Sequence, residues 1–218
     1  GSVSHLGYVM LGIFALNAQG LSGGLLQMVG HGLSTGALFL LVGMVYERRH
    51  TRLIADFGGL AASMPRFTFF FLLTTLASIG LPGLNGFVGE FLILLGAFKA
   101  APVFAVLAAL GVVLGAVYML WMVQRVFFGP LTREENRSLG DLCPREWLLL
   151  LPVAALMLWI GLYPKPFLGR IEPAVAALLE SARPGIAAPA GALHGQLDAQ
   201  GGALRLPAAL TPTPSRGE

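Results

Sequence analysis

Three ionisable side chains lie inside long stretches of this 218-residue sequence that carry almost no charge. Glu90 is the only charged residue between residues 67 and 98. His31 and His5 fall within residues 1–46, which contain no Asp, Glu, Lys or Arg. An imidazole takes up and releases protons near neutral pH, and a carboxylate in apolar surroundings must be paired or neutral. The chemistry that these residue types offer is therefore proton transfer.

The composition predicts where this chemistry would take place. Hydrophobic residues make up 56% of the chain and charged residues only 11%, whereas a soluble domain has about a quarter charged residues. The formal net charge is +3, too small for a surface that tracks nucleic acid. A single cysteine excludes an iron–sulfur cluster or a thiolate metal site. We expect a polytopic membrane protein in the lipid bilayer, with no metal and no cofactor on this chain.

The uncharged stretches predict an all-α fold, a bundle of about five transmembrane helices within residues 1–168. A helix needs roughly 20 apolar residues to cross about 30 Å of hydrocarbon. The expected helices cover 3–17, 22–46, 67–98 (broken near 80–86), 103–127 and 147–164. An amphipathic helix at 171–182 and a tail rich in Pro, Gly and Ala at 183–218 would follow.

The break expected in the third helix would set the position of Glu90. The run Gly80-Leu81-Pro82-Gly83-Leu84-Asn85-Gly86 favours two half-helices, 67–80 and 87–98, because proline removes a backbone donor and glycine adds freedom. A proline kink or a short interfacial loop is the alternative. Asn85 and nearby carbonyls would face polar surroundings. Glu90 would lie in the first turns of the second half-helix, whose N-terminus favours the charged carboxylate while burial disfavours it. Such a group can gain and lose a proton; otherwise Glu90 is structural and satisfied by a partner chain.

The two histidines have hydroxyl residues beside them. Ser34 and Thr35 follow His31 within one helical turn, and Ser2 and Ser4 flank His5. A histidine on an apolar helix can also be only a hydrogen-bonded core residue, so a structural role is the alternative for both.

Arginines predict the orientation of the chain. They gather in two loops, 47–66 and 125–146, which are separated by two spans and so share one side. The positive-inside rule places these loops in the cytoplasm and the C-terminus outside, in the inner (plasma) membrane of a prokaryotic cell.

Two segments, 20–24 and 32–36, match the G-x-S-x-G pattern of serine hydrolases. That motif requires a turn between a strand and a helix, and neither serine follows a predicted strand. As Gly-x-x-x-Gly pairs, these segments and residues 111–115 favour close helix packing. A rhomboid-like protease using Ser22 is the remaining enzymatic alternative.

Several strings together resemble one family. They are Ser2-Val3-Ser4-His5-Leu6-Gly7, His31-Gly32-Leu33-Ser34-Thr35-Gly36, Tyr46-Glu47-Arg48-Arg49-His50 and Leu81-Pro82-Gly83-Leu84-Asn85-Gly86-Phe87-Val88-Gly89-Glu90-Phe91. Over residues 2–168 the chain is similar to the C-terminal part of the antiporter-like subunit M family of respiratory complex I, called subunit 4 in mitochondria. The resemblance implies the last five of fourteen spans, with the discontinuous helix at the break.

The same resemblance implies a function. Glu90 matches an essential glutamate of the family, and His31 and His5 match histidines on its buried polar axis. The chain would be a non-redox, proton-translocating subunit of an NADH:quinone oxidoreductase. Its partners would be other membrane subunits, while NADH oxidation and quinone reduction occur elsewhere, without direct NADH binding. A subunit of a Mrp-type cation/proton antiporter or of a membrane-bound hydrogenase, and a passive scaffold subunit, are the alternatives.

Overall fold

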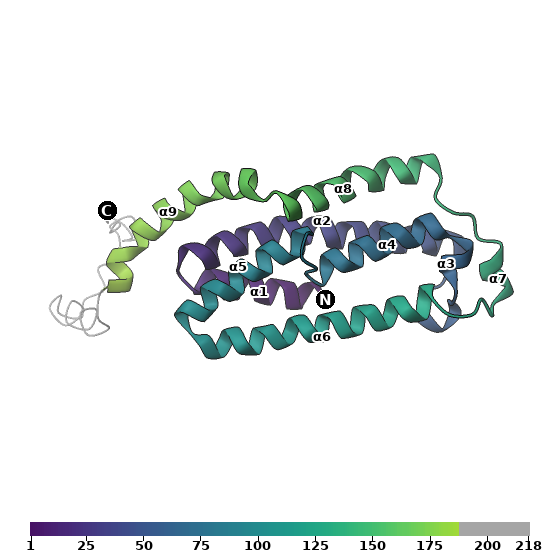
Figure 1. Ribbon diagram of the computed structural model, residues 1–218, viewed down its shortest axis with the longest axis horizontal. Coiled ribbons are helices and arrows are strands. Elements are labelled where there is room, and N and C mark those ends of the chain that lie inside the picture. The colour runs from purple at the N-terminus through teal and green to yellow at the C-terminus, as the bar shows by residue number, and fades with distance from the viewer. Residues whose placement is uncertain (188–218) are drawn as a thin grey trace, which may run out of the picture. The chain divides into compact units, whose positions relative to one another are not determined.

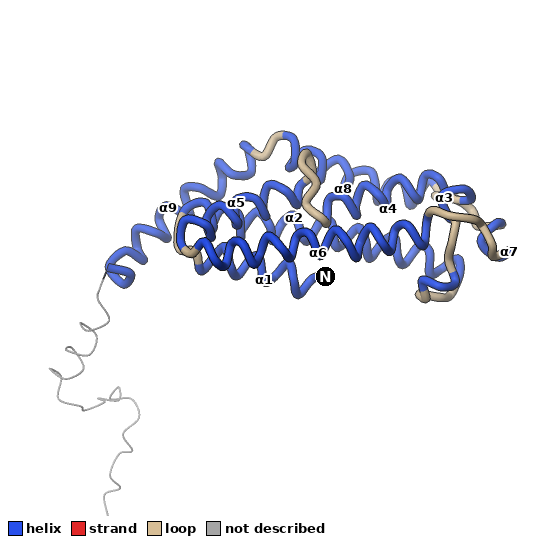
Figure 2. Tube along the Cα trace, turned by 60° about the horizontal axis from the view of Figure 1, so that its bottom comes forward, coloured by secondary structure: helices blue, strands red, loops and turns tan. Residues whose placement is uncertain are grey.

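The computed structural model describes residues 1–187, with side chains up to residue 182, and all regular structure in this range is helical (Figures 1 and 2). The long helices are α1 (Ser2–Phe14), α2 (Ala18–Arg49), α4 (Pro65–Ser78), α5 (Asn85–Ala100), α6 (Pro102–Phe127), α8 (Pro144–Leu162) and α9 (Lys165–Ala187). Short helices occur at η1 (Ile54–Asp56), α3 (Leu60–Ser63) and α7 (Glu134–Arg137). The chain divides into two units, Gly1–Leu179 and Glu180–Glu218, and the helix bundle and the candidate site described below belong to the first.

Three helices of the described range, α2, α6 and α8, are each long and apolar enough to cross a membrane. Three other helices are shorter: α1 has 13 residues, α4 has 14 and α5 has 16. Between α4 and α5, residues 79–84 form no helix, and this is where the sequence predicted the interruption (Figure 1). The predicted span 67–98 is therefore two half-helices in the structure.

Glycines allow α1, α2 and α5 to pack backbone against backbone. A β-carbon on Gly96 of α5 would lie 2.4 Å from the backbone nitrogen of Gly20, and one on Gly23 of α2 would lie 2.7 Å from that of Ile93. Gly24 likewise faces Val9 of α1 at 3.3 Å. The packing predicted for residues 20–24 thus occurs. It does not occur for the pair 32 and 36, where a β-carbon would meet nothing of the described chain within 4 Å.

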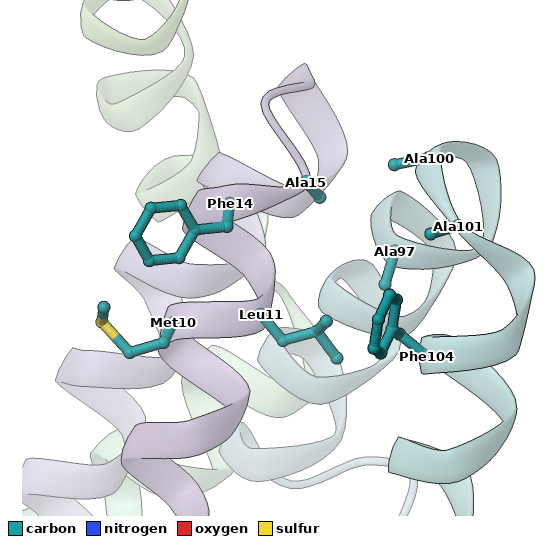
Figure 3. A pocket seen from close by; sticks show the side chains of 8 residues that line it. All are labelled: Met10, Leu11, Phe14, Ala15, Ala97, Ala100, Ala101 and Phe104. Carbon is teal, nitrogen blue, oxygen red and sulfur yellow. The ribbon is translucent and has the colours of Figure 1, made fainter.

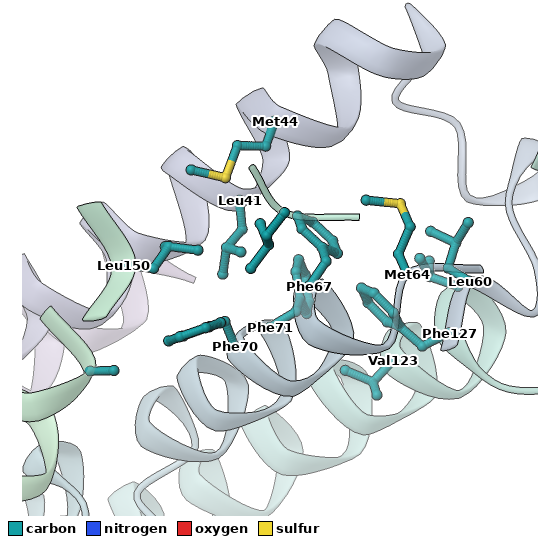
Figure 4. Close-up of a cluster of buried hydrophobic side chains, with 13 residues drawn as sticks. Leu41, Met44, Leu60, Met64, Phe67, Phe70, Phe71, Val123, Phe127 and Leu150 are labelled. Carbon is teal, nitrogen blue, oxygen red and sulfur yellow. The ribbon is translucent and has the colours of Figure 1, made fainter. Parts of the chain in front are cut away.

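Aromatic and aliphatic side chains fill the bundle where the C-terminal parts of α2 and α6 meet the first turns of α4 (Figure 4). Phe71 of α4 and Phe127 of α6 lie with ring centroids 4.6 Å apart, and Phe67 stacks on Phe127 at 6.0 Å. Leu41 of α2 is fully buried against them. This cluster joins α2, α4 and α6 near their loop ends.

Arg48 and Glu146 hold the two arginine-rich loops together. The Arg48 guanidinium binds both Glu146 oxygens, at 2.8 and 2.7 Å, and its Nε donates to the Gly140 carbonyl at 2.9 Å. Asp141 of the same loop accepts hydrogen bonds from the backbone of Arg66 and Phe67 at the start of α4. The two loops therefore lie at the same end of the bundle, as the arginine pattern predicted.

An apolar groove of about 360 Å³ lies between α1 and the turn from α5 to α6 (Figure 3). Its walls come from Met10, Leu11, Phe14, Ala15, Ala97, Ala100, Ala101 and Phe104. All of these side chains are apolar and none can be protonated near neutral pH, so the groove offers none of the proton chemistry expected of this chain.

The last described helix differs from its prediction. An amphipathic helix was expected only at 171–182, but α9 begins at Lys165 and ends at Ala187. Pro166 falls in the first turn, where a helix needs no backbone donor, so it does not delay the start. Pro173 and Pro184, which come later in α9, each lack a backbone N–H donor, but the helix continues past both. Residues 183–187 of the expected tail therefore belong to α9, and the rest of it lies outside the described residues.

Candidate functional site

The loop at residues 79–84 lets two helix ends approach closely. Gly80 adopts a positive φ of 74°, which an L side chain disfavours, and a β-carbon on Gly86 would lie 2.1 Å from the Ala77 carbonyl oxygen. Asn85, which is fully buried, donates from its amide to the Gly30 carbonyl of α2 at 2.8 Å. These contacts fix the start of α5 against both α4 and α2, and Glu90 follows in its second turn.

The Glu90 carboxylate lies where three helices and the loop meet. The residue is only 6% exposed. Its Oε1 accepts a hydrogen bond of 3.2 Å from Gln27 Nε2 on α2 and lies 3.3 Å from His5 Nδ1 on α1. Its Oε2 lies against Gly80, because a β-carbon there would approach this oxygen to 2.5 Å. Both carboxylate oxygens therefore have defined neighbours.

The two histidines extend this arrangement away from Glu90. The imidazole rings of His5 and His31 have their centroids 5.0 Å apart, and His31 Nδ1 lies 3.0 Å from the Thr35 hydroxyl. Thr35, His31, His5 and Glu90 thus form one contiguous series. Ser34, expected beside His31, instead donates to the Gly30 carbonyl.

A small cavity adjoins this series. Its volume of about 20 Å³ is enough for one water molecule, which needs two to four polar partners. The polar side chains on its wall are Ser4, His5, Tyr8, Ser78, Glu90 and Tyr118. Tyr8 donates its hydroxyl to the Ala108 carbonyl, which ties α1 to α6. A water molecule here could connect His5 and Glu90 to hydroxyl groups of α4 and α6.

The structure brings together the three residues predicted from sequence, Glu90, His5 and His31, although they come from three helices. The prediction missed Gln27, the second partner of the carboxylate. A signal was present, because Gln27, His31 and Thr35 recur at intervals of four and so share one helix face. His50 lies elsewhere, at the C-terminal end of α2 with its ring 5.9 Å from that of Tyr46.

The serine-hydrolase interpretation finds no support in the described residues. Ser22 is buried inside the continuous helix α2, and no strand precedes it. His31 contacts His5 and Thr35 instead. The described part of the chain also contains no group of three or more His, Cys, Asp or Glu suited to a metal ion.

Residues 1–115 match the family described as NADH:quinone oxidoreductase/Mrp antiporter, transmembrane. The chain belongs to this family. The resemblance seen in the sequence and the all-helical membrane fold are thereby confirmed, and members of this family are multi-pass membrane proteins.

Relatives within the NADH:quinone oxidoreductase/Mrp antiporter family are similar over most of the chain. NADH-quinone oxidoreductase subunit M of Rhodobacter capsulatus is 47% identical over 180 residues, which cover 83% of this chain and 35% of that protein. NADH-ubiquinone oxidoreductase chain 4 of Arabidopsis thaliana is 45% identical over 179 residues, or 82% of this chain and 36% of that one. The chain thus spans about a third of the length of these relatives.

Solved structures of the same family share the fold. A chain of respiratory complex I from Thermus thermophilus with bound NADH superposes with a TM-score of 0.77 at 39% identity, covering 81% of this chain and 37% of that chain. A chain of the Mrp complex from Dietzia sp. DQ12-45-1b gives a TM-score of 0.72 at 22% identity, over 82% and 41% of the two chains. At that identity the second likeness concerns the fold alone.

Proposed function

We propose that this chain is part of a proton-translocating, antiporter-like subunit M of an NADH:quinone oxidoreductase. The observation that carries the proposal is the contact of His5 with Glu90 and of His31 with His5, which turns three isolated ionisable residues into one series. The names of the relatives at 45–47% identity support the assignment to complex I.

In this proposal Glu90 alternates between carboxylate and carboxylic acid. His5 Nδ1 lies 3.3 Å from Glu90 Oε1 but forms no hydrogen bond with it, so a proton passes to the carboxylate after a small rotation of the imidazole or through a water molecule. His31 supplies His5 through a ring movement or a water molecule, and Thr35 holds the His31 ring. Moving one charge against 100 mV costs about 2.3 kcal/mol, so a driver outside this chain is needed. Partner subunits would supply it through quinone reduction, while this chain binds neither NADH nor a redox cofactor.

Purification of the native assembly tests this function. We expect the tagged chain to co-purify with NADH-oxidising and quinone-reducing subunits, and inverted vesicles containing it to acidify when NADH and a quinone are added. Mass spectrometry and a pH-sensitive dye measure the two results. Cation/proton exchange without NADH, and co-purification with other antiporter subunits alone, would favour the Mrp-type alternative. Assembly without any role in acidification would favour a passive scaffold.

The proposal also includes an orientation. The ends of α2 and α6 and the start of α8, with the loops at 50–64 and 128–143, would face the cytoplasm of a prokaryotic cell, and residues after α8 would face outward. Cysteines introduced at Ser138 and Ser181 in a Cys143→Ser background should therefore react with an impermeant maleimide from opposite sides of the plasma membrane. Labelling of intact cells and of inverted vesicles measures this. Labelling of both positions from one side would contradict the orientation.

A further inference from the structure

Gln27 lies at the closest approach of α2 to α5. A β-carbon on Gly89, the residue before Glu90, would lie 2.4 Å from Gln27 Oε1 and 3.0 Å from its α-carbon. Gly23, one turn earlier on α2, meets the backbone of Ile93 in the same way. The absence of side chains at both glycines therefore places the Gln27 amide directly beside the Glu90 carboxylate.

Only one of the two polar atoms of the Gln27 amide forms a hydrogen bond. Gln27 is 2% exposed, and its Nε2 donates to Glu90 Oε1. Its own Oε1 is buried without a hydrogen-bond partner. A buried acceptor without a partner is destabilising, so packing alone does not account for an amide at this position. What an apolar residue could not do is donate a hydrogen bond to Glu90.

We propose that Gln27 is a positioning residue that sets the proton affinity of Glu90. This inference rests on the proposed function and adds a group to it. An amide donor is satisfied by the carboxylate but gains less from the carboxylic acid, so Gln27 favours the charged form. It shares Oε1 with His5 and so holds the oxygen that faces the imidazole. Gln27 would thereby determine the pH at which Glu90 can release its proton.

Other titratable groups face Glu90 and set the background for this effect. They are His5 and Tyr8 from α1, His31 of α2 through His5, and Tyr118 from α6. α4 contributes Ser78, which does not titrate in this range. The ionisable residues of α8, Arg145 and Glu146, belong to its first turn, where Glu146 pairs with Arg48. None of these groups is altered when Gln27 is replaced.

The test is the pH profile of NADH-driven proton pumping by the assembled complex in vesicles. Gln27→Met keeps the length of the side chain but removes the donor, so the acid limb of the profile should move to higher pH. Gln27→Glu adds a like charge and should move the limb further in the same direction. Gln19→Met, two helical turns earlier on α2 and not among the partners of Glu90, should leave the profile unchanged.

The possible outcomes separate this inference from the proposed function. An unshifted profile in Gln27→Met, whether the rate is normal or reduced, means that the amide is structural and overturns the inference. If Gln27→Met does not assemble, the profile of Gln27→Glu decides in the same manner. Normal pumping by Glu90→Gln would instead overturn the proposed function itself.

Discussion

Replacement of Glu90 by glutamine should sharply reduce proton pumping while the complex still assembles. Glutamine keeps the size of the side chain and can still contact Gln27 and His5, but it cannot gain or lose a proton. We expect the pumping rate, and the NADH oxidation coupled to it, to fall roughly tenfold or more, because a positioned acid–base group contributes at least that much. The measurements are dye quenching in vesicles and the amount of assembled complex on a native gel.

Two further variants define what Glu90 contributes. Glu90→Asp keeps the carboxylate but shortens its reach toward His5 by one methylene, so part of the activity should remain. His31→Ala should do less damage than Glu90→Gln, because a water molecule can bridge a gap where polar groups such as the Thr35 hydroxyl are present. Normal pumping by a fully assembled Glu90→Gln complex would show that the carboxylate is structural.

Replacement of Gly86 by alanine should disrupt the break between α4 and α5. The new methyl group would lie 2.1 Å from the Ala77 carbonyl oxygen, and this oxygen belongs to the backbone and cannot rotate away. The start of α5 must then move and take Glu90 out of reach of His5. Such overpacking destabilises by about 1–3 kcal/mol or more. We expect less assembled complex, a lower Tm of what assembles, and little pumping.

A second glycine provides the control for this effect. A β-carbon on Gly43 of α2 would meet nothing of the described chain within 4 Å. Gly43→Ala should therefore assemble and pump normally, since alanine is the better helix former. Equal losses in both variants would show that the membrane helices tolerate no added methyl group, and that the contact at Ala77 is not special.

The sequence was sufficient to predict the break because its cause is local. Proline and glycine between Gly80 and Gly86 act on their own backbone, and a carboxylate in an uncharged segment is visible without a structure. The contact of Gln27 with Glu90 was not predictable in the same way. It depends on how far α2 slides along α5, and that register follows from backbone contacts at Gly23 and Gly89 on two different helices.

The helix ends show the same distinction between local and distant causes. The sequence predicted the first turn at residues 17–20, and the structure has it slightly earlier, at 15–17. Its cause is local, because the Asn17 side chain caps α2 by accepting from the Gly20 backbone at 2.9 Å. Asp141, by contrast, lies 75 positions from Arg66, whose backbone it accepts from at the start of α4. No pattern near residue 66 indicates that partner.

The carboxyl group of Glu90 has two chemically identical oxygens in unequal surroundings. Oε1 faces the amide of Gln27 and the imidazole of His5, whereas Oε2 faces the backbone of the loop at Gly80. A protonated carboxyl group can bind one proton on Oε1 while a different proton leaves from Oε2, because the C=O double bond shifts between the two oxygens, and this relay needs no rotation of the side chain. In the proposed function, the asymmetry of the two surroundings would therefore give a symmetric functional group an entrance and an exit.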